Sequence, residues 1–367
     1  MKKTIIITIS GLLFSLFIFL ISFNFVNQEK NQKNINDLKF FKKEEKKEQT
    51  DQKTESNNQN ETQKEKEEDL NLNLLFFGDL MLDRHVGEKI NIHGFDYLFE
   101  KLETEKFTED YDFVMANLEG AVTNDGLHHK PDNLYDFAFK PEIIEKLKKY
   151  NFNIFTLSNN HLSDQGEKGI TETYQNLSEL GFNYFGCKDG NLSSLKNITT
   201  VYKAEENEKQ KILNNEDCSA IIIETKNKKI AFFAFSIVYQ DIEEIKILNQ
   251  IEALKKQSDF LIISPHWGVE YQEKANKKQE NLARKMIDSG ADLIIGHHPH
   301  VIQNYEIYKE KPIFYSLGNF IFDQYFSKET QEGLAVSIII NKNNQIQKTV
   351  YKIKTQGSKI EEINKIE

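Results

Sequence analysis

The chain of 367 residues has a formal net charge of −10, and its 39% hydrophobic and 28% charged residues suit a globular protein with a polar appendage. An acidic balance without a basic stripe excludes nucleic acid as the expected partner. The two cysteines, Cys187 and Cys218, are too few for a disulfide framework, and the lack of a C-x-x-C motif excludes a zinc ribbon. The sequence leaves open whether this pair forms one bridge or stays as two thiols.

The N-terminal segment has the pattern of a membrane anchor. Lys2 and Lys3 precede an uncharged run over residues 4–26, which as a helix would span about 35 Å and cross a bilayer. A cleavable signal peptide is the alternative, but its apolar part would be shorter and would end in small residues, whereas this run ends in Phe25 and Val26. We expect a single-pass anchor over 1–26 in the cell membrane, with a cytoplasmic N-terminus and an extracytoplasmic main domain.

Composition divides the rest of the chain. Residues 27–69 are rich in Lys, Glu, Gln and Asn and almost without apolar side chains, which predicts a disordered charged linker. The main domain is expected over 70–355, followed by a C-terminal tail over 356–367.

Within the main domain, short apolar runs predict strands and longer runs with helical spacing predict helices. In chain order the predicted strands are 74–77, 113–116, 152–157, 183–185, 220–224, 230–235, 260–263, 291–295, 301–308, 313–315, 334–340 and 348–353. The predicted helices are 95–102, 141–150, 164–180, 241–257 and 275–289. The pair 220–224 and 230–235 indicates a hairpin, and the whole indicates an α/β domain.

Polar side chains follow five of these strands directly. They are Asp79, Asn117 with Glu119, Asn160 with His161, His266, and His298 with His300. The carboxyl ends of parallel strands face one crevice in an α/β sheet, so we expect these side chains to meet there. Oxygen and imidazole ligands without a thiolate suit Mn, Zn, Fe or Mg, as one or two ions.

Three local patterns refine this site. His298 and His300 are two residues apart, a spacing that in extended backbone points both imidazoles the same way, although a polar turn of hydrogen-bonded histidines is the alternative. Asp164 and Glu167 have the spacing of a capping box, so Asp164 is interpreted as structural. His128 lies in a predicted exposed loop, where it could contact an anion. The chain has no P-loop and no G-x-S-x-G elbow.

Six motifs in one order resemble the CapA family of poly-gamma-glutamate capsule synthesis proteins. They are Gly78-Asp79-Leu80-Met81-Leu82, Asn117-Leu118-Glu119-Gly120, Asn159-Asn160-His161 with Asp164 and Gly166, His266-Trp267-Gly268-Val269-Glu270-Tyr271, Gly296-His297-His298-Pro299-His300-Val301, and Ser316-Leu317-Gly318-Asn319-Phe320 with Phe322-Asp323-Gln324. The resemblance covers about residues 74–340. That family is similar to calcineurin-like metallophosphoesterases, which implies a four-layer sandwich of two mixed sheets flanked by helices.

Carried over by position, the resemblance implies roles for individual residues. The metal ligands would be Asp79, Glu119, Asn160, His266, His298 and His300, and His161 would be the general acid. Residues expected to support these ligands or to contact substrate are Asn117, Asp164, His297, Trp267, Glu270, Tyr271, Asn319 and Asp323. Two differences stand out. Met81 occupies the place of a ligand histidine of typical phosphoesterases, and Glu119 takes the place of their bridging aspartate.

Three functions are compatible with these patterns. The first is a metal-dependent hydrolase of the phosphoesterase type, acting on poly-gamma-glutamate or another anionic envelope polymer. The second is a non-catalytic component of a capsule synthesis or export complex. The third is a polymer-binding module.

Overall fold

The computed structural model describes residues 71–128, 135–187, 201–203, 219–239 and 242–367. The predicted anchor and linker lie outside these ranges. Within them, none of the helices combines the length and the apolar character that crossing a bilayer requires.

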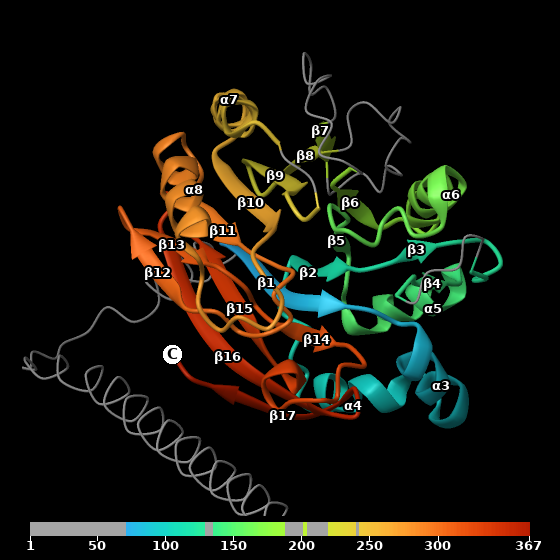
Figure 1. Cartoon of the computed structure of the whole chain (residues 1–367). Coiled ribbons are helices and arrows are strands. Elements are labelled where there is room, and N and C mark those ends of the chain that lie inside the picture. The colour runs from blue at the N-terminus through green and yellow to red at the C-terminus, as the bar shows by residue number, and fades with distance from the viewer. Residues whose placement is uncertain (1–70, 129–134, 188–200, 204–218, 240–241) are drawn as a thin grey trace, which may run out of the picture. The chain divides into compact units, whose positions relative to one another are not determined.

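The first of two large sheets contains the N-terminal and C-terminal strands of the main domain. Its members are β1 (Leu72–Leu80), β2 (Phe113–Leu118), β5 (Ile154–Thr156), β6 (Asn183–Phe185), β14 (Asn319–Ile321), β15 (Glu332–Ile340), β16 (Ile346–Gln356) and β17 (Lys359–Lys365). Their order is β17-β16-β15-β1-β2-β5-β6, with β14 paired to the end of β1 (Figure 1). Strands β1, β2, β5 and β6 run parallel, whereas β15, β16 and β17 pair antiparallel, so the sheet is mixed.

The second sheet is formed by the middle of the chain. Its members are β7 (Val201–Lys203), β8 (Ala220–Thr225), β9 (Lys228–Ser236), β10 (Phe260–His266), β11 (Leu293–Ile295), β12 (Tyr305–Tyr308) and β13 (Lys311–Phe314). Their order is β12-β13-β11-β10-β9-β8-β7, in which β9, β10, β11 and β13 are parallel. The predicted hairpin is confirmed as the antiparallel pair β8–β9. A further small sheet pairs β3 (Ala121–Val122) with β4 (Ala138–Phe139).

Helices cover the outer faces of both sheets. They are α3 (Arg84–His93), α4 (Asp96–Thr104), α5 (Pro141–Glu145) continued by the 3-10 helix η1 (Lys146–Tyr150), α6 (Gly166–Glu179), α7 (Glu244–Lys255) and α8 (Lys277–Asp288), with the short 3-10 turn η5 (Glu329–Gln331). Figure 1 shows α7 and α8 beside the second sheet, whereas α3, α4 and α6 lie beside the first.

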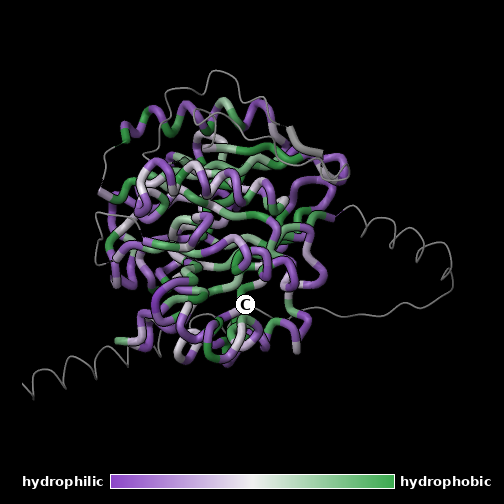
Figure 2. Tube along the Cα trace, turned by 90° about the vertical axis from the view of Figure 1, so that its right-hand side faces the viewer, coloured by the Kyte–Doolittle hydropathy of each residue, from purple (hydrophilic) through white to green (hydrophobic). Residues whose placement is uncertain are grey.

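Three hydrophobic cores hold four layers together. One core lies between the two sheets, a second joins the first sheet to α3, α4 and α6, and a third joins the second sheet to α7 and α8. Along β1, the alternation of a strand sends Leu74 and Phe76 into the core between the sheets and Leu75 and Phe77 into the helix-side core. In Figure 2, the inner strands have long hydrophobic stretches and the outer loops are largely hydrophilic.

Several boundaries differ from the predictions. The predicted C-terminal tail is wrong, because Lys359–Lys365 form β17, which pairs with β16. Only Tyr305–Tyr308 of the predicted strand over 301–308 is a strand. Helix α3 was not predicted, since Val86 and Ile90 are its only buried residues.

Candidate metal centre

The centre is built around Asp79, at the carboxyl end of β1. Its neighbours in register are Asn117 on β2 and Asn319 on β14, so three polar residues stand side by side on adjacent strands. The register between β1 and β2 shifts just before Asp79, an irregularity of the kind that re-aims side chains near sites. Asp79 is fully buried.

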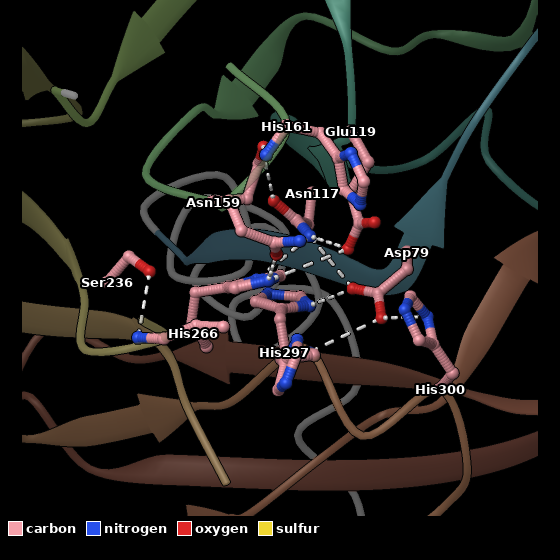
Figure 3. Close-up of polar contacts among 12 residues, drawn as sticks. Asp79, Asn117, Glu119, Asn159, His161, Ser236, His266, His297 and His300 are labelled. Carbon is pink, nitrogen blue, oxygen red and sulfur yellow. Dashed lines mark hydrogen bonds and ion pairs between the residues drawn. The ribbon is translucent and has the colours of Figure 1, made fainter. Parts of the chain in front are cut away.

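The amide of Asn117 joins the two carboxylates. Its Nδ2 donates to Asp79 Oδ1 and to Glu119 Oε1, both at 2.9 Å (Figure 3). The side chain of Asn159 in turn donates to Asn117 Oδ1 at 3.1 Å and to the carbonyl of Leu118 at 2.8 Å. Sequence reasoning did not assign a role to Asn159, although its place before Asn160 and His161 was a usable signal.

His266 brings the second sheet to the same point. Its Nε2 lies 2.7 Å from Asn160 Oδ1 and 3.9 Å from Glu119 Oε1, and its Nδ1 lies 3.4 Å from Asn117 Nδ2. Ligand atoms of Asp79, Glu119 and His266 all lie within 4.8 Å of one another. These side chains come from β1, from the end of β2 and from β10, so the centre spans both sheets.

The histidine turn closes the other side of Asp79. His297 Nδ1 lies 3.2 Å from Asp79 Oδ1, and His300 Nδ1 lies 3.2 Å from Asp79 Oδ2 and 3.0 Å from Asn319 Oδ1. The prediction that extended backbone aligns His298 and His300 is wrong, since their φ angles are +95° and +56°. A strained turn brings their ring centroids to 5.9 Å instead.

His161 and Asp164 form a pair at the edge of the centre. His161 Nδ1 lies 2.8 Å from Asp164 Oδ2, which also accepts the backbone N–H of Phe137 at 2.8 Å. The capping-box prediction for Asp164 is therefore wrong: α6 begins after Gln165, without a side-chain cap. The ring of Phe137 lies 4.2 Å from that of His161, which fixes the imidazole further.

The remaining predicted residues have distinct surroundings. Trp267 is buried on the α7–α8 side of its sheet, where Nε1 donates to the carbonyl of Tyr315 at 2.9 Å, so it packs and does not contact substrate. Asp323 is fully buried and forms a two-point ion pair with Arg84. Glu270 and the exposed Tyr271 follow β10 and lie beside the histidine turn. Burial and the neighbouring Glu270 carboxylate raise the pKa of Tyr271 to about 12.

His128 is exposed, as predicted, but its imidazole faces two carboxylates and not a free anion site. Its Nε2 and Nδ1 lie 3.0 Å from carboxylate oxygens of Asp83 and Asp136, respectively. Residues 129–134 lie outside the described residues. Cys187 is disulfide-bonded. Cys218 lies outside the described residues.

Burial and neighbouring charged groups together shift the pKa values of the residues in the centre. Burial would raise the pKa of Asp79, but hydrogen bonds and charges of His297 and His300 hold it well below its ordinary value. Burial and the charge of Asp79 raise the pKa of Glu119 well above its usual range. Burial would lower the pKa of His300, but the carboxylates of Glu119 and Asp79 raise it to about 9.

The imidazoles of His266 and His298 remain neutral. Burial and the proximity of His298 lower the pKa of His266 well below its ordinary value. Burial likewise lowers the pKa of His298 to about 3, with the charge of His300 adding to the effect. Neutral imidazole is the form that binds a metal ion.

The residues present fit a divalent ion. Three buried polar atoms in the centre have no hydrogen-bond partner: Glu119 Oε2, His297 Nε2 and His298 Nδ1. A buried polar atom without a partner costs about 1–3 kcal/mol, and coordination would satisfy such atoms. Carboxylate oxygens and imidazole nitrogens are the donors that Mn, Zn and Fe accept in proteins.

Fold and site together define an α/β protein of two packed mixed sheets with a candidate metal centre at the strand ends. Residues 73–324 match the family described as "Bacterial capsule synthesis protein PGA_cap". The chain belongs to this family of bacterial capsule synthesis proteins, which confirms the resemblance derived from its motifs.

Similar proteins agree with this membership. The chain is 33% identical to the "Capsule biosynthesis protein CapA" of Bacillus anthracis, over 72% of this chain and 62% of that protein. It is 32% identical to the "PGA biosynthesis protein CapA" of Bacillus subtilis, over 74% of this chain and 68% of that protein. The match to the Bacillus anthracis protein thus spans less than two thirds of that protein's length.

Solved structures are more distant. A phosphatase from Mycoplasma pneumoniae has a TM-score of 0.44 at 13% identity, covering 81% of this chain and 92% of its own. A hypothetical protein from Thermus thermophilus has a TM-score of 0.40 at 14% identity, covering 80% of this chain and 98% of its own.

Proposed function

We propose that this protein is a metal-dependent hydrolase of the phosphoesterase type, on a metallophosphoesterase-like four-layer sandwich. The observation that carries the proposal is the buried group of Asp79, Glu119 and His266, whose ligand atoms lie within 4.8 Å of one another. Asn160 would complete this set, because its Oδ1 lies beside His266 Nε2. A bound divalent ion supplies Lewis-acid activation of water and of a phosphoryl or carbonyl oxygen.

His161 is the proton donor in this proposal. Its Nδ1 faces Asp164, which leaves Nε2 to give a proton to the leaving group, and its partial exposure allows contact with a substrate. The Asp164 carboxylate and the Phe137 ring hold the imidazole in one orientation. Asn117 and Asn159 keep the two carboxylates of the centre in place.

The substrate class follows from the family. Relatives carry the names capsule biosynthesis protein and PGA biosynthesis protein, so the proposed substrate is an anionic envelope polymer such as poly-gamma-glutamate, or a phosphoester linked to its synthesis. The protein would act within a capsule synthesis complex. We further propose that residues 4–26 anchor it in the cell membrane and that the linker over 27–69 places the main domain outside.

The full chain, purified and loaded with Mn²⁺, Zn²⁺, Fe²⁺ or Mg²⁺, tests the catalytic proposal. We expect bound metal and hydrolysis of bis-p-nitrophenyl phosphate, a generic phosphodiester. Asp79→Asn should lose both metal and activity, whereas His161→Gln should lose activity and keep the metal. Absence of bound metal and of hydrolysis with all four ions would contradict the proposal.

One observation favours the second candidate, a non-catalytic component of a synthesis complex. Met81 offers no ligand to the centre, since it is buried in the helix-side core and its Sδ accepts the backbone N–H of Asp83 at 3.0 Å. Cells that lack the native protein can be supplied with His161→Gln. Restored capsule with this variant would support the scaffold, whereas a capsule-free cell with normal protein levels would support the enzyme.

A further inference from the structure

A second group of possible ligands lies beside the first. Glu270, His298 and His300 each place a ligand atom within 4.8 Å of the others. The two histidines are 3% exposed, whereas Glu270 is partly exposed. We propose that Glu270 is a metal ligand and that it forms, with His298 and His300, a second ion site on the open side of the centre. This inference rests on the proposed function, because it adds a second ion to the one proposed at Asp79, Glu119 and His266.

The backbone holds Glu270 at this position. The loop after β10 turns at Gly268, whose φ is +94°, and again at Tyr271, whose φ is +62°. The N–H of Tyr271 donates to the carbonyl of Pro299 at 2.8 Å, which ties the loop to the turn between His298 and His300. A left-handed conformation at a bulky residue such as Tyr271 costs free energy and persists where surrounding contacts enforce it.

His298 supplies a buried nitrogen without a partner. Its Nδ1 is enclosed and accepts or donates no hydrogen bond to the protein. The His298 ring lies 4.9 Å from that of His266 and 5.9 Å from that of His300, measured between centroids, so it stands between the two groups. An unsatisfied imidazole nitrogen at this depth is destabilising unless something coordinates it.

Of the two ring nitrogens of His300, Nδ1 is held by hydrogen bonds and Nε2 is the candidate metal ligand. Its Nδ1 faces two oxygen atoms, Asn319 Oδ1 at 3.0 Å and Asp79 Oδ2 at 3.2 Å, so this nitrogen carries the proton. Nε2 is then the nitrogen that would bind an ion, which would displace the proton held there by the neighbouring carboxylates. A ligand histidine whose other nitrogen is held by an amide or a carboxylate is the usual arrangement in metal sites.

Asp79 connects the two groups. Its Oδ1 accepts a hydrogen bond from Asn117 Nδ2 at 2.9 Å, on the side of Glu119. Its Oδ2 lies 3.2 Å from His300 Nδ1. Asp79, a member of the first group, therefore contacts a ligand of the second. Three protein ligands leave coordination positions open, and the partial exposure of Glu270 puts those positions on the side that a substrate can reach.

Metal stoichiometry tests the assignment without any measurement of turnover. The full chain is loaded with Mn²⁺, freed of excess ion and analysed for Mn per chain, alongside Glu270→Gln and the matched control Glu273→Gln, an exposed carboxylate three residues later. We expect two ions in the wild type and in the control, and one in Glu270→Gln. Electron paramagnetic resonance should change from a spin-coupled pair to the six-line spectrum of a single Mn²⁺.

Two further variants separate loss of the ion from loss of the fold. His298→Gln should also retain one ion, and Glu119→Gln should retain one ion at the other position, each with an unchanged circular dichroism spectrum. Two ions in Glu270→Gln would overturn the assignment. One ion in both the wild type and Glu270→Gln would overturn the second site and leave the proposed function intact. No bound ion in the wild type would overturn both.

Discussion

Arg84 and Arg284 each form a two-point ion pair, but their carboxylate partners differ in burial. Arg84 Nε and Nη2 lie 2.9 Å from the oxygens of Asp323, whose side chain is 0% exposed. Arg284 Nε and Nη2 lie 2.9 and 2.8 Å from the oxygens of Glu306, whose side chain is 26% exposed. A buried charge that loses its partner cannot be solvated, whereas an exposed one can.

These two ion pairs therefore predict losses of stability that differ in size. Arg84→Gln should lower the free energy of unfolding by about 3 kcal/mol, because it strands the Asp323 carboxylate in the interior. Arg284→Gln should have a much smaller effect, since water replaces the lost partner of Glu306. Urea unfolding followed by circular dichroism measures both, and equal losses would contradict the dependence on burial.

His128 gives a pH-dependent contribution. Burial would lower its pKa, but the carboxylates of Asp136 and Asp83 outweigh this and raise it above 6.5. When folding raises the pKa of a group, the group stabilises the folded state fully at pH values below its pKa in the unfolded chain. This stabilisation is lost as the pH rises through its pKa in the folded protein. The Tm difference between wild type and His128→Gln should be largest near pH 6 and should shrink toward pH 9. In an Asp136→Asn background the same comparison should depend less on pH, and an unchanged dependence would contradict this account.

The residues of the centre were predictable to different degrees. Asp79, Asn117 and Glu119 lie at the ends of apolar strands in the first sheet, so their convergence could be expected from the rule that parallel strand ends share one edge, whereas His266 comes from the second sheet. The place of Glu270 was implied only by the family resemblance, because it depends on left-handed turns in a loop whose conformation no periodicity encodes. Asp164 matched a capping pattern, yet its carboxylate is engaged by His161 and by the Phe137 backbone.

At the scale of elements, β1 is the strand against which the centre is assembled. It pairs with β15 along most of its length and then with β14, whose approach is so close that a Cβ on Gly78 would lie 1.9 Å from the carbonyl oxygen of Gly318. The next N–H, that of Asp79, donates to the same oxygen at 3.0 Å. Contact between these backbones thus fixes where the Asp79 carboxylate lies.

Gly78→Ala should accordingly destabilise the protein and displace Asp79. The clash involves backbone atoms that cannot rotate away, so we expect a loss of about 2–4 kcal/mol by comparison with other steric changes in cores. The control is Gly87→Ala on α3, where an added Cβ would meet its nearest neighbour, the Leu82 carbonyl oxygen, at 3.4 Å, an ordinary contact. That variant should be neutral or stabilising by about 0.5–1 kcal/mol. Thermal unfolding separates the two, and a stable Gly78→Ala protein would contradict the close approach.

Elements with continuous apolar runs were the most predictable. Strands β2, β9 and β10 are buried on both faces, and such runs stand out in sequence. Helix α3 and strand β17 lie at the surface and present few apolar side chains, so their patterns resemble those of loops and tails. Pairing with β16 forms β17 although local propensity alone does not indicate a strand there.

At the scale of the whole molecule, the candidate centre links the two sheets. Asp79, Asn117 and Glu119 come from the first sheet, and His266, His298 and His300 come from the ends of β10 and β11 in the second. Between the sheets lies an apolar core, whose burial is not directional, and polar contacts such as Lys226 Nζ to Asp112 Oδ1 at 2.7 Å lie at its margin. An ion held by residues of both sheets would stabilise the folded state alone.

Metal removal should therefore lower the melting temperature. A ligand at a hundredfold excess over its Kd adds about 2.7 kcal/mol to the stability, which for a domain of this size is roughly 5 °C in Tm. Differential scanning fluorimetry with Mn²⁺ and with a chelator measures the shift, and His266→Gln should reduce it. Identical Tm values for wild type in both conditions would contradict a metal that joins the sheets.

Strand β17 closes the first sheet with a row of charges. Lys359, Glu361, Glu362 and Lys365 line this outermost strand, and Ile360 is buried beneath it against the helix-side core. Charged edge strands discourage pairing with other molecules. A chain shortened to residue 355 would expose the long edge of β16 and the apolar surface under Ile360, and would self-associate into larger species on gel filtration. We therefore expect Lys359–Lys365 to block pairing at this edge of the sheet, a task separate from the chemistry at the strand ends near Asp79.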